Sequence, residues 1–223
     1  MTGNPDILSE RDGPSTITLD REILSAIPYG SRVLESACAW GRTAFELEKM
    51  GYRVTAFDID PEIVSRARKN ADLTGSEVKL IVADGCDLPF GNGSFDACVM
   101  NGFLTMLDER EKREAAIKEA WRVLVPGGFL YIADFIQTWS DPTYAERYRA
   151  HFPITGEIGT FLATEDGSLD GKVMYRAHHH TVEELLELIG GGFNVRSRSK
   201  TTFTSYHGNR VDGCVILAQR SSG

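Results

Sequence analysis

Short apolar runs alternate with amphipathic stretches along most of the chain. The apolar runs have the length of buried strands, and the stretches between them repeat apolar residues at helical spacing. This alternation predicts βαβ units and a parallel sheet. The predicted strands are Arg32–Ser36, Val54–Asp58, Val78–Ala83, Ala97–Asn101, Phe129–Asp134, Phe193–Ser199 and Gly213–Gln219.

Capping residues indicate where several helices begin. Asp60 followed by Pro61 is typical of an N-cap and a first helical position. An opening helix is predicted from about Thr18 to Ile27, and another runs from Gly41 to Gly51. The capping-box pattern predicts two further starts, at Asp108 with Glu111 and at Thr181 with Glu184. Ile117, Trp121 and Leu124 are expected to share one face of the helix that begins near Asp108.

The stretch from about residue 136 to 180 is much longer than an ordinary connection between a strand and a helix. Long connections of this kind are usually functional. Within it, Thr160–Ala163 and Lys172–Tyr175 flank two Asp-Gly pairs and are predicted to form a hairpin. We therefore expect residues 1–223 to form one domain, with a substrate-shaping insert at about 136–180.

Four short segments contain the residues that could form a ligand site. They are Val33-Leu34-Glu35-Ser36-Ala37-Cys38-Ala39-Trp40-Gly41-Arg42, Val54-Thr55-Ala56-Phe57-Asp58, Asp84-Gly85-Cys86-Asp87-Leu88-Pro89-Phe90 and Val125-Pro126-Gly127-Gly128. Taken in this order, they resemble class I S-adenosylmethionine (SAM)-dependent methyltransferases, especially the small-molecule type of ubiquinone and menaquinone biosynthesis. The resemblance implies an α/β, Rossmann-like, seven-stranded and mostly parallel sheet, with helices on both faces and an antiparallel last strand.

The turn after the first strand favours SAM over a dinucleotide. A close backbone approach needs small residues, and Ala37, Ala39 and Gly41 stand two apart. A GxGxxG fingerprint would require its last glycine at position 42, which is Arg42. Relatives would carry glycine at positions 37 and 39, so the two alanines are departures from the family pattern.

The resemblance also implies the cofactor contacts, with S-adenosylhomocysteine as the product. Asp58 ends the second strand, where an acid can accept hydrogen bonds from ribose hydroxyls. Ile59 would pack on the adenine, and Asp84 would accept a bond from its amino group. The remaining predicted contacts are Gly85 and Cys86 at the ring edge, Glu35 and Asn101 near the methionine portion, and Ala37, Ala39 and Gly41 in the turn.

A general base helps methyl transfer only when the acceptor is a hydroxyl or a protonated amine. The residues that could supply such a base lie in the insert. The candidates are His151, His178 and Tyr148. His178, His179 and His180 are consecutive, so in an extended strand their side chains alternate between faces and cannot all converge. No metal site is therefore predicted. Five aromatic residues of the insert could line an apolar acceptor pocket: Tyr144, Tyr148, Phe152, Phe161 and Tyr175.

The composition of the chain limits which binding partners are expected. The formal net charge is −8 with no dense basic run, which disfavours nucleic acid and favours a small-molecule methyl acceptor. No apolar run is long enough to span a membrane, and residues 1–14 lack a signal-peptide pattern. Four cysteines without a CxxC pair fit a reduced compartment, so we expect a cytoplasmic protein. A homodimer is left open.

Three alternatives stay open beside a SAM-dependent methyltransferase that acts by in-line displacement. One is an aminopropyl transferase of the same fold, which Glu35 at the amino-acid end of the site disfavours. Another is a non-catalytic SAM-binding or structural module, for which Ala37 and Ala39 are the main support. An NAD oxidoreductase is disfavoured by Arg42.

Overall fold

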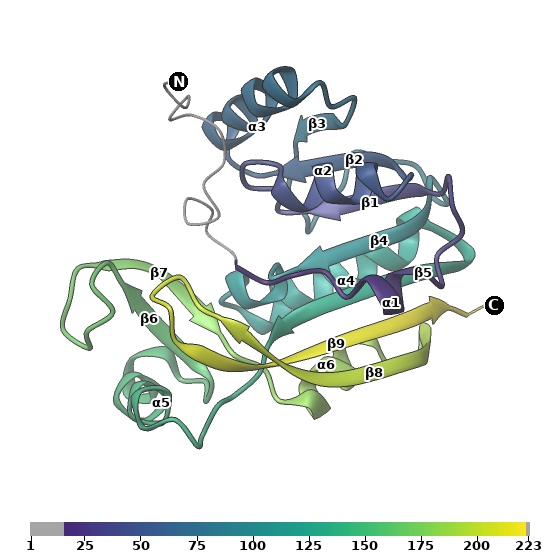
Figure 1. The fold of residues 1–223 in the computed structure, drawn as a ribbon. Helices are drawn as coiled ribbons and strands as arrows, with labels where there is room; N and C mark the ends of the chain where they lie inside the picture. The colour runs from purple at the N-terminus through teal and green to yellow at the C-terminus, as the bar shows by residue number, and fades with distance from the viewer. Residues whose placement is uncertain (1–15, 222–223) are drawn as a thin grey trace.

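A computed structural model describes residues 16–221, which form a seven-stranded sheet with helices on both faces and a separate two-stranded hairpin (Figure 1). The prediction for residues 1–14 therefore lies outside the described residues. The strands are β1 Arg32–Ser36, β2 Arg53–Asp58, β3 Lys79–Val82, β4 Phe95–Asn101, β5 Leu124–Phe135, β6 Thr160–Thr164, β7 Val173–His178, β8 Phe193–Thr204 and β9 Arg210–Arg220. The helices are α1 Arg21–Leu24, α2 Arg42–Lys49, α3 Pro61–Thr74, the 3-10 turn η1 Leu104–Met106, α4 Arg110–Val123, α5 Pro142–Thr155 and α6 Val182–Ile189.

The order of strands in the main sheet is β3-β2-β1-β4-β5-β9-β8. β1 pairs in parallel with both β2 and β4. Strands β2 and β3 extend the sheet on one side of β1, and β4 and β5 extend it on the other. β9 runs antiparallel to β5 and to β8. The predicted seven-stranded, mostly parallel sheet is thereby confirmed, and its switch point lies beside β1.

Two buried clusters cover the two faces of the sheet. On one face, Leu24 of α1, Ala44 and Leu47 of α2 and Val64 of α3 pack against the strands. The other face packs against α4 and α6, whose buried residues include Ile117, Ala120, Leu185 and Ile189. Helical spacing of apolar residues thus produces the expected three-layer arrangement.

The insert folds as a small unit beside the main sheet. The predicted hairpin is present as β6 and β7, which pair antiparallel. α5, which was not predicted, begins after Asp141, whose side chain accepts from the backbone N–H groups of Thr143 and Tyr144. Tyr144 and Tyr148 of α5 pack with Phe161 of β6 in a third buried cluster.

Helix starts at Asp60 and at the Thr181–Glu184 capping box are confirmed. The predicted capping box at Asp108 is wrong, because α4 has Glu109 at its N-cap and no side-chain cap. The Asp108 carboxylate instead pairs with Lys112 at 3.2 Å. Asp108 therefore lies one residue before the N-cap and forms an ion pair with the first turn of α4.

Several element lengths also differ from the prediction. The opening helix is only one turn, Arg21–Leu24. β5 begins at Leu124, which was assigned to the preceding helix, and its pairing with β4 shifts register between Phe95 and Ala97. Gly127 in this stretch has a φ of 75°, so the glycine pair bends an extended strand instead of preceding it. Trp121 is 37% exposed and stacks on Arg220 rather than entering the core with Ile117.

None of the helices in the described part of the chain has both the length and the apolar character needed to cross a bilayer.

Candidate cofactor and acceptor site

A cavity of about 480 Å³ opens at the carboxyl ends of the parallel strands, next to the switch point. Its size is within the usual range for small-molecule sites. One end is lined by residues that follow β1, β2 and β3, and the other by aromatic residues of the insert. Ligands of open α/β sheets bind at this edge, so the position alone marks a candidate site.

The turn after β1 is held in an unusual backbone conformation. Ala37 and Ala39 both adopt left-handed geometry, with φ of 55° and 47°, and both line the cavity. Left-handed geometry normally favours glycine, so each alanine is strained by roughly 1 kcal/mol. The backbone N–H of Ala39 donates to Asp58 at 3.1 Å, and that of Cys38 donates to Phe57 at 2.8 Å. These bonds fix the turn against β2 and stabilise the strained geometry.

Gly41 has a role in the turn that differs from the one expected. It is the N-cap of α2, with a φ of 94°, and does not line the cavity. A Cβ at this position would lie 2.4 Å from the Phe45 ring. The structure therefore explains Gly41 by the packing of α2, and its predicted cofactor contact stays a prediction.

Asp58 and Asp84 lie at the same cavity although 26 residues separate them in the sequence. Asp58 also accepts from the Asp60 N–H at 3.2 Å, and Asp84 accepts from the Cys86 N–H at 2.8 Å. Each carboxylate oxygen has two lone pairs, so both acids keep capacity for a ligand. Ile59 also lines the cavity and is 66% exposed, which leaves an apolar surface for a ring to cover.

Gly85 and Cys86 differ in their relation to the cavity. Gly85 is part of the lining, and a Cβ there would lie 2.5 Å from Phe103, so only glycine fits between the two walls. Cys86 is outside the lining, and its thiol donates to the carbonyl of Lys112. Its predicted contact with the adenine edge stays a prediction.

Two buried acceptors close to this end have no partner within the described residues. Asn101 lines the cavity and donates to Ile17 and Thr43, but its Oδ1 is unpaired. Glu35 is 1% exposed and lies outside the lining, and its Oε2 is unpaired as well. Burial, with the nearby Asp58 carboxylate, raises the pKa of Glu35 well above its ordinary value. Unpaired buried acceptors are costly, so both oxygens suit a donor from a ligand.

The insert supplies the opposite end of the cavity. Tyr144, Phe161 and Tyr175 line it, together with His179 and Arg147. Tyr148 and Phe152, which were also expected there, are not part of the lining. The Arg147 guanidinium lies 5.5 Å from the Tyr144 ring centroid and 5.8 Å from that of Phe161. It is 3% exposed and donates to the carbonyl of Gly167. This wall is apolar and aromatic with one buried positive charge.

His179 stands at the centre of this wall. Its Nδ1 lies 2.7 Å from the Tyr148 hydroxyl, and its ring packs against Phe135 and Phe161. The Tyr148 oxygen already accepts from the N–H of Thr138, so the hydroxyl proton is directed at His179 Nδ1. Burial, His178 and Arg147 lower the pKa of His179 to about 3. The ring is therefore neutral at pH 7, and its proton is on Nε2.

The three predicted catalytic candidates are not part of the cavity lining. Tyr148 lies behind it and reaches the cavity through His179. His151 is buried against the insert and accepts from the Leu162 N–H at 3.2 Å, and burial lowers its pKa. His178 points to the other side of β7. Their catalytic roles remain predictions.

Sequence reasoning missed several residues of the lining. Tyr206 and His207 come from the turn between β8 and β9, and Thr105 and Met106 from η1. No local motif marks these positions, since only the packing of distant elements brings them to the cavity. Of the three consecutive histidines, one of which was expected to face the substrate, His179 lines the cavity. Alternation along the chain places its side chain opposite those of its two neighbours.

Comparison with known proteins agrees with this geometry. The family model described as a methyltransferase domain matches residues 34–132. The crystal structure of a SAM-dependent methyltransferase from Methanosarcina mazei is 33% identical, with a TM-score of 0.87, and the match covers 91% of this chain and 98% of that one. The chain belongs to the SAM-dependent methyltransferase family.

Two relatives of this chain are named as methyltransferases of menaquinone or ubiquinone. A demethylmenaquinone methyltransferase of Thermus thermophilus is 36% identical over 107 residues, which are 47% of each chain. A ubiquinone/menaquinone biosynthesis C-methyltransferase of Zymomonas mobilis is 28% identical over 171 residues, 75% of this chain and 69% of that one. The chain spans about half the length of the first curated relatives it matches.

The residues present fit SAM. Asp58 can accept from two ribose hydroxyls, and Asp84 can accept from an exocyclic amine. The unpaired oxygens of Glu35 and Asn101 suit the ammonium group of a methionine moiety. Ile59 and Gly85 both line the cavity, where a ring of the cofactor could contact them.

Proposed function

We propose that the protein transfers a methyl group from SAM to a small-molecule acceptor that has a planar ring. The observation that carries the proposal is the continuity of the cavity. Asp58 and Asp84 line one end of it, and Tyr144, Phe161 and His179 line the other. A cofactor and an acceptor could therefore meet in a single enclosed space.

When bound, SAM supplies a methyl group on a positively charged sulfur, which is already an activated leaving group. The protein's own task is then to hold the acceptor in line and to exclude water. Asp58, Asp84 and the Ala37–Ala39 turn would fix the cofactor end. The aromatic wall would orient a flat acceptor by stacking, with Arg147 offering a positive charge to an oxygen substituent.

His179 is suited to positioning rather than to removing a proton. Its Nδ1 is occupied by the Tyr148 hydroxyl, and its Nε2 carries the proton of the neutral ring. A protonated Nε2 donates a hydrogen bond to an acceptor oxygen. The proposed chemistry therefore suits an acceptor that is nucleophilic without a strong base, such as an ionised hydroxyl near Arg147 or an electron-rich ring carbon.

Two alternatives remain distinguishable by experiment. An aminopropyl transferase would use decarboxylated SAM, and the unpaired acceptors at Glu35 and Asn101 support an intact amino-acid end instead. A non-catalytic SAM-binding module would bind SAM but would not consume it. The enclosed aromatic wall supports catalysis. Cytoplasmic location and a homodimer are part of the proposal that only direct measurement can test.

Calorimetric titration with SAM and S-adenosylhomocysteine tests the cofactor end. Asp58→Ala should weaken binding about 10- to 100-fold, because it removes charge-assisted hydrogen bonds. Asp72→Ala, an exposed acid on α3, is the matched control and should bind like the wild type. Absence of binding by the wild type, or unchanged binding by Asp58→Ala, would contradict the assignment.

The acceptor is tested by transfer of radiolabelled methyl from SAM to a panel of hydroquinones, catechols and simple phenols. Methylated product is expected from at least one ring class, and Phe161→Ala should reduce its rate. SAM binding without turnover on any of these rings would favour the non-catalytic module.

A further inference from the structure

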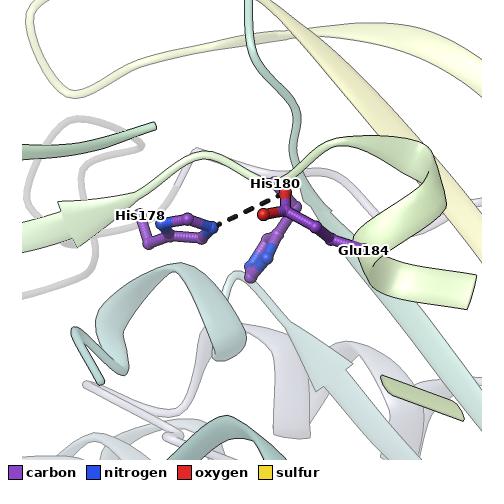
Figure 2. Close-up of side chains that lie close together, drawn as sticks. All are labelled: His178, His180 and Glu184. Atoms are coloured by element: carbon purple, nitrogen blue, oxygen red, sulfur yellow. Dashed lines mark ion pairs between the residues drawn. The ribbon is translucent and has the colours of Figure 1, made fainter. Parts of the chain in front are cut away.

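His178 and His180 lie behind the acceptor wall, on the side opposite His179. Both are 0% exposed, and they are two residues apart at the end of β7, so their side chains point the same way. Figure 2 shows the His178 ring directed toward the carboxylate of Glu184, which comes from the first turn of α6, and the His180 ring close to both. The side chains of the three histidines do alternate between two sides. This alternation leaves His178 and His180 together on one side, where α6 adds the carboxylate of Glu184.

The donor atoms of this cluster are close, and three of its histidine nitrogens are unpaired, whereas Glu184 Oε2 also accepts from the Thr181 N–H. One ligand atom from each of the three residues lies within 4.8 Å of the others, and His178 Nε2 is 3.8 Å from Glu184 Oε2. His178 Nε2 and both ring nitrogens of His180 have no hydrogen-bond partner among residues 16–221. Each unpaired buried polar group costs about 1–3 kcal/mol, so the cluster is incomplete as it stands.

Neighbouring groups hold His178 in the orientation that a ligand needs. Its Nδ1 lies 2.7 Å from Thr160 Oγ1 and 3.3 Å from Glu157 Oε2. An imidazole that donates through one nitrogen to an oxygen presents the lone pair of the other nitrogen, which is the usual arrangement behind a metal-bound histidine. Arg113 is buried beside this group, but its positive charge is paired with Glu157.

We propose that His178, His180 and Glu184 bind a divalent first-row transition metal of the zinc class. Two imidazoles and one carboxylate match the donors of three-ligand zinc sites, where a water completes the tetrahedron. Nitrogen donors disfavour calcium and magnesium, which take oxygen ligands. Zinc bonds of about 2.0–2.1 Å place tetrahedral donors about 3.3 Å apart, so closure requires shifts of about 1 Å.

The site would connect the insert to the core. His178 is the last residue of β7, His180 lies just after it in a bridge with Ile136, and Glu184 belongs to α6, which packs on the main sheet. His179 stands between the two histidine ligands and faces the cavity. A bound metal would fix the backbone of residues 178–180 and thereby the position of His179 in the acceptor wall. The metal is structural and positioning in this proposal, and it contacts neither SAM nor the acceptor.

Metal binding is tested on the full chain after removal of metals with a chelator. Titration with Zn²⁺ should show one site per chain, and Co²⁺ should give the intense visible bands of tetrahedral coordination. His180→Gln and Glu184→Gln should each weaken Zn²⁺ binding at least about 100-fold. Glutamine can still complete the capping box at position 184, so that variant keeps its helix start. His207→Gln, an exposed histidine of the chain, should bind Zn²⁺ like the wild type.

Two readouts separate a metal site from a folding defect. S-adenosylhomocysteine affinity should be the same in the wild type and Glu184→Gln, and Zn²⁺ should raise the melting temperature of the wild type but not of Glu184→Gln. The proposal is overturned if the metal-free wild type takes up no stoichiometric Zn²⁺ or Co²⁺. It is also overturned if folded Glu184→Gln binds Zn²⁺ as tightly as the wild type. Neither result depends on whether the protein methylates a small molecule.

Discussion

The cavity end lined by Asp58 and Asp84 is formed by turns at the ends of parallel strands, whereas the end lined by Tyr144 and Phe161 is formed by side chains of a helix and a hairpin. At the first end, the backbone determines the shape, through the left-handed turn at Ala37 and the close packing at Gly85. At the second, shape depends on how aromatic rings pack in a separate cluster.

This difference indicates how one fold can keep its cofactor and change its acceptor. The strand-end turns are constrained by the pairing of the sheet, so substitutions there disturb the fold and the ligand together. The insert has a buried cluster of its own, which can be repacked without moving β1 or β2. Cofactor affinity and acceptor choice should therefore respond to different substitutions.

Phe161→Ala is expected to have the largest effect on stability. Phe161 is 4% exposed and packs against Tyr144, Tyr148 and His179. Removing a buried ring should lower the free energy of unfolding by about 3 kcal/mol, measured by chemical denaturation. S-adenosylhomocysteine affinity should stay within twofold of the wild type at a temperature where the variant is folded. The control is Met174→Ala on β7, which is 54% exposed. A large loss of cofactor affinity would show that the two ends are not independent.

Asp134 binds the backbone of two residues of the cavity lining, Thr105 and Phe135, and should make the stability of the protein depend on pH. It is 0% exposed at the end of β5 and accepts from the N–H groups of Thr105 and Phe135. Burial raises its pKa to about 7, from an ordinary value of 3.8. The folded state therefore holds a proton that the unfolded chain has lost, and the stability this confers is present below about pH 4 and is lost as pH rises through 7.

The measurement compares unfolding free energies of the wild type and Asp134→Asn at pH 5 and pH 8. Only the two pH units between 5 and the folded pKa of about 7 contribute. At about 1.4 kcal/mol per unit, Asp134 should cost the wild type about 3 kcal/mol, and the variant should lack that component. Asparagine presents only one acceptor oxygen to two N–H donors, so the variant should be less stable at pH 5. Parallel pH curves for the two proteins would contradict the raised pKa.

Gly85→Ala should affect the cofactor end alone. The added Cβ would lie 2.5 Å from Phe103 and 3.3 Å from Phe57, and the Phe103 ring must shift within the cavity wall. We expect about a tenfold loss of S-adenosylhomocysteine affinity, or about 1.4 kcal/mol. Gly91→Ala is the matched control, since its Cβ would meet only Ser94 at 3.8 Å. Equal affinities for the two variants would place the adenosine away from Gly85.

The sheet, and the meeting of Asp58 and Asp84 at one cavity, could be predicted because their signals are local. Strand patterns, the Asp60-Pro61 helix start and the acids at strand ends are each visible within a few residues. The parallel arrangement then brings Asp58 and Asp84 to one edge. Local patterns do not tell which of two possible contacts a side chain makes. Asp108, for example, forms an ion pair with Lys112 and does not cap α4.

The acceptor end was only partly predictable, because its residues meet through tertiary packing. Tyr144 and Phe161 were expected there from their aromatic character, but Arg147 and Tyr206 have no sequence signal that would place them. The histidine run shows the same limit. Alternation separates His179 from its neighbours, but no spacing rule indicates that Glu184 of α6 turns toward His178.

Ala39→Gly is expected to have the smallest effect and to test the strained turn most directly. Ala39 has a φ of 47° and lines the cavity. Glycine relieves about 1 kcal/mol of left-handed strain but loses a similar amount through the greater entropy of the unfolded chain, so stability should change by less than about 0.5 kcal/mol. Removing the methyl group widens the approach to the turn, and S-adenosylhomocysteine should bind two- to threefold more tightly in calorimetry. Ala163→Gly, at the acceptor end, removes the same group from the opposite wall and should leave cofactor affinity unchanged. Weaker binding by Ala39→Gly would mean that the methyl group contacts the cofactor favourably, and the departure from glycine would then be an adaptation of the turn instead of an obstruction.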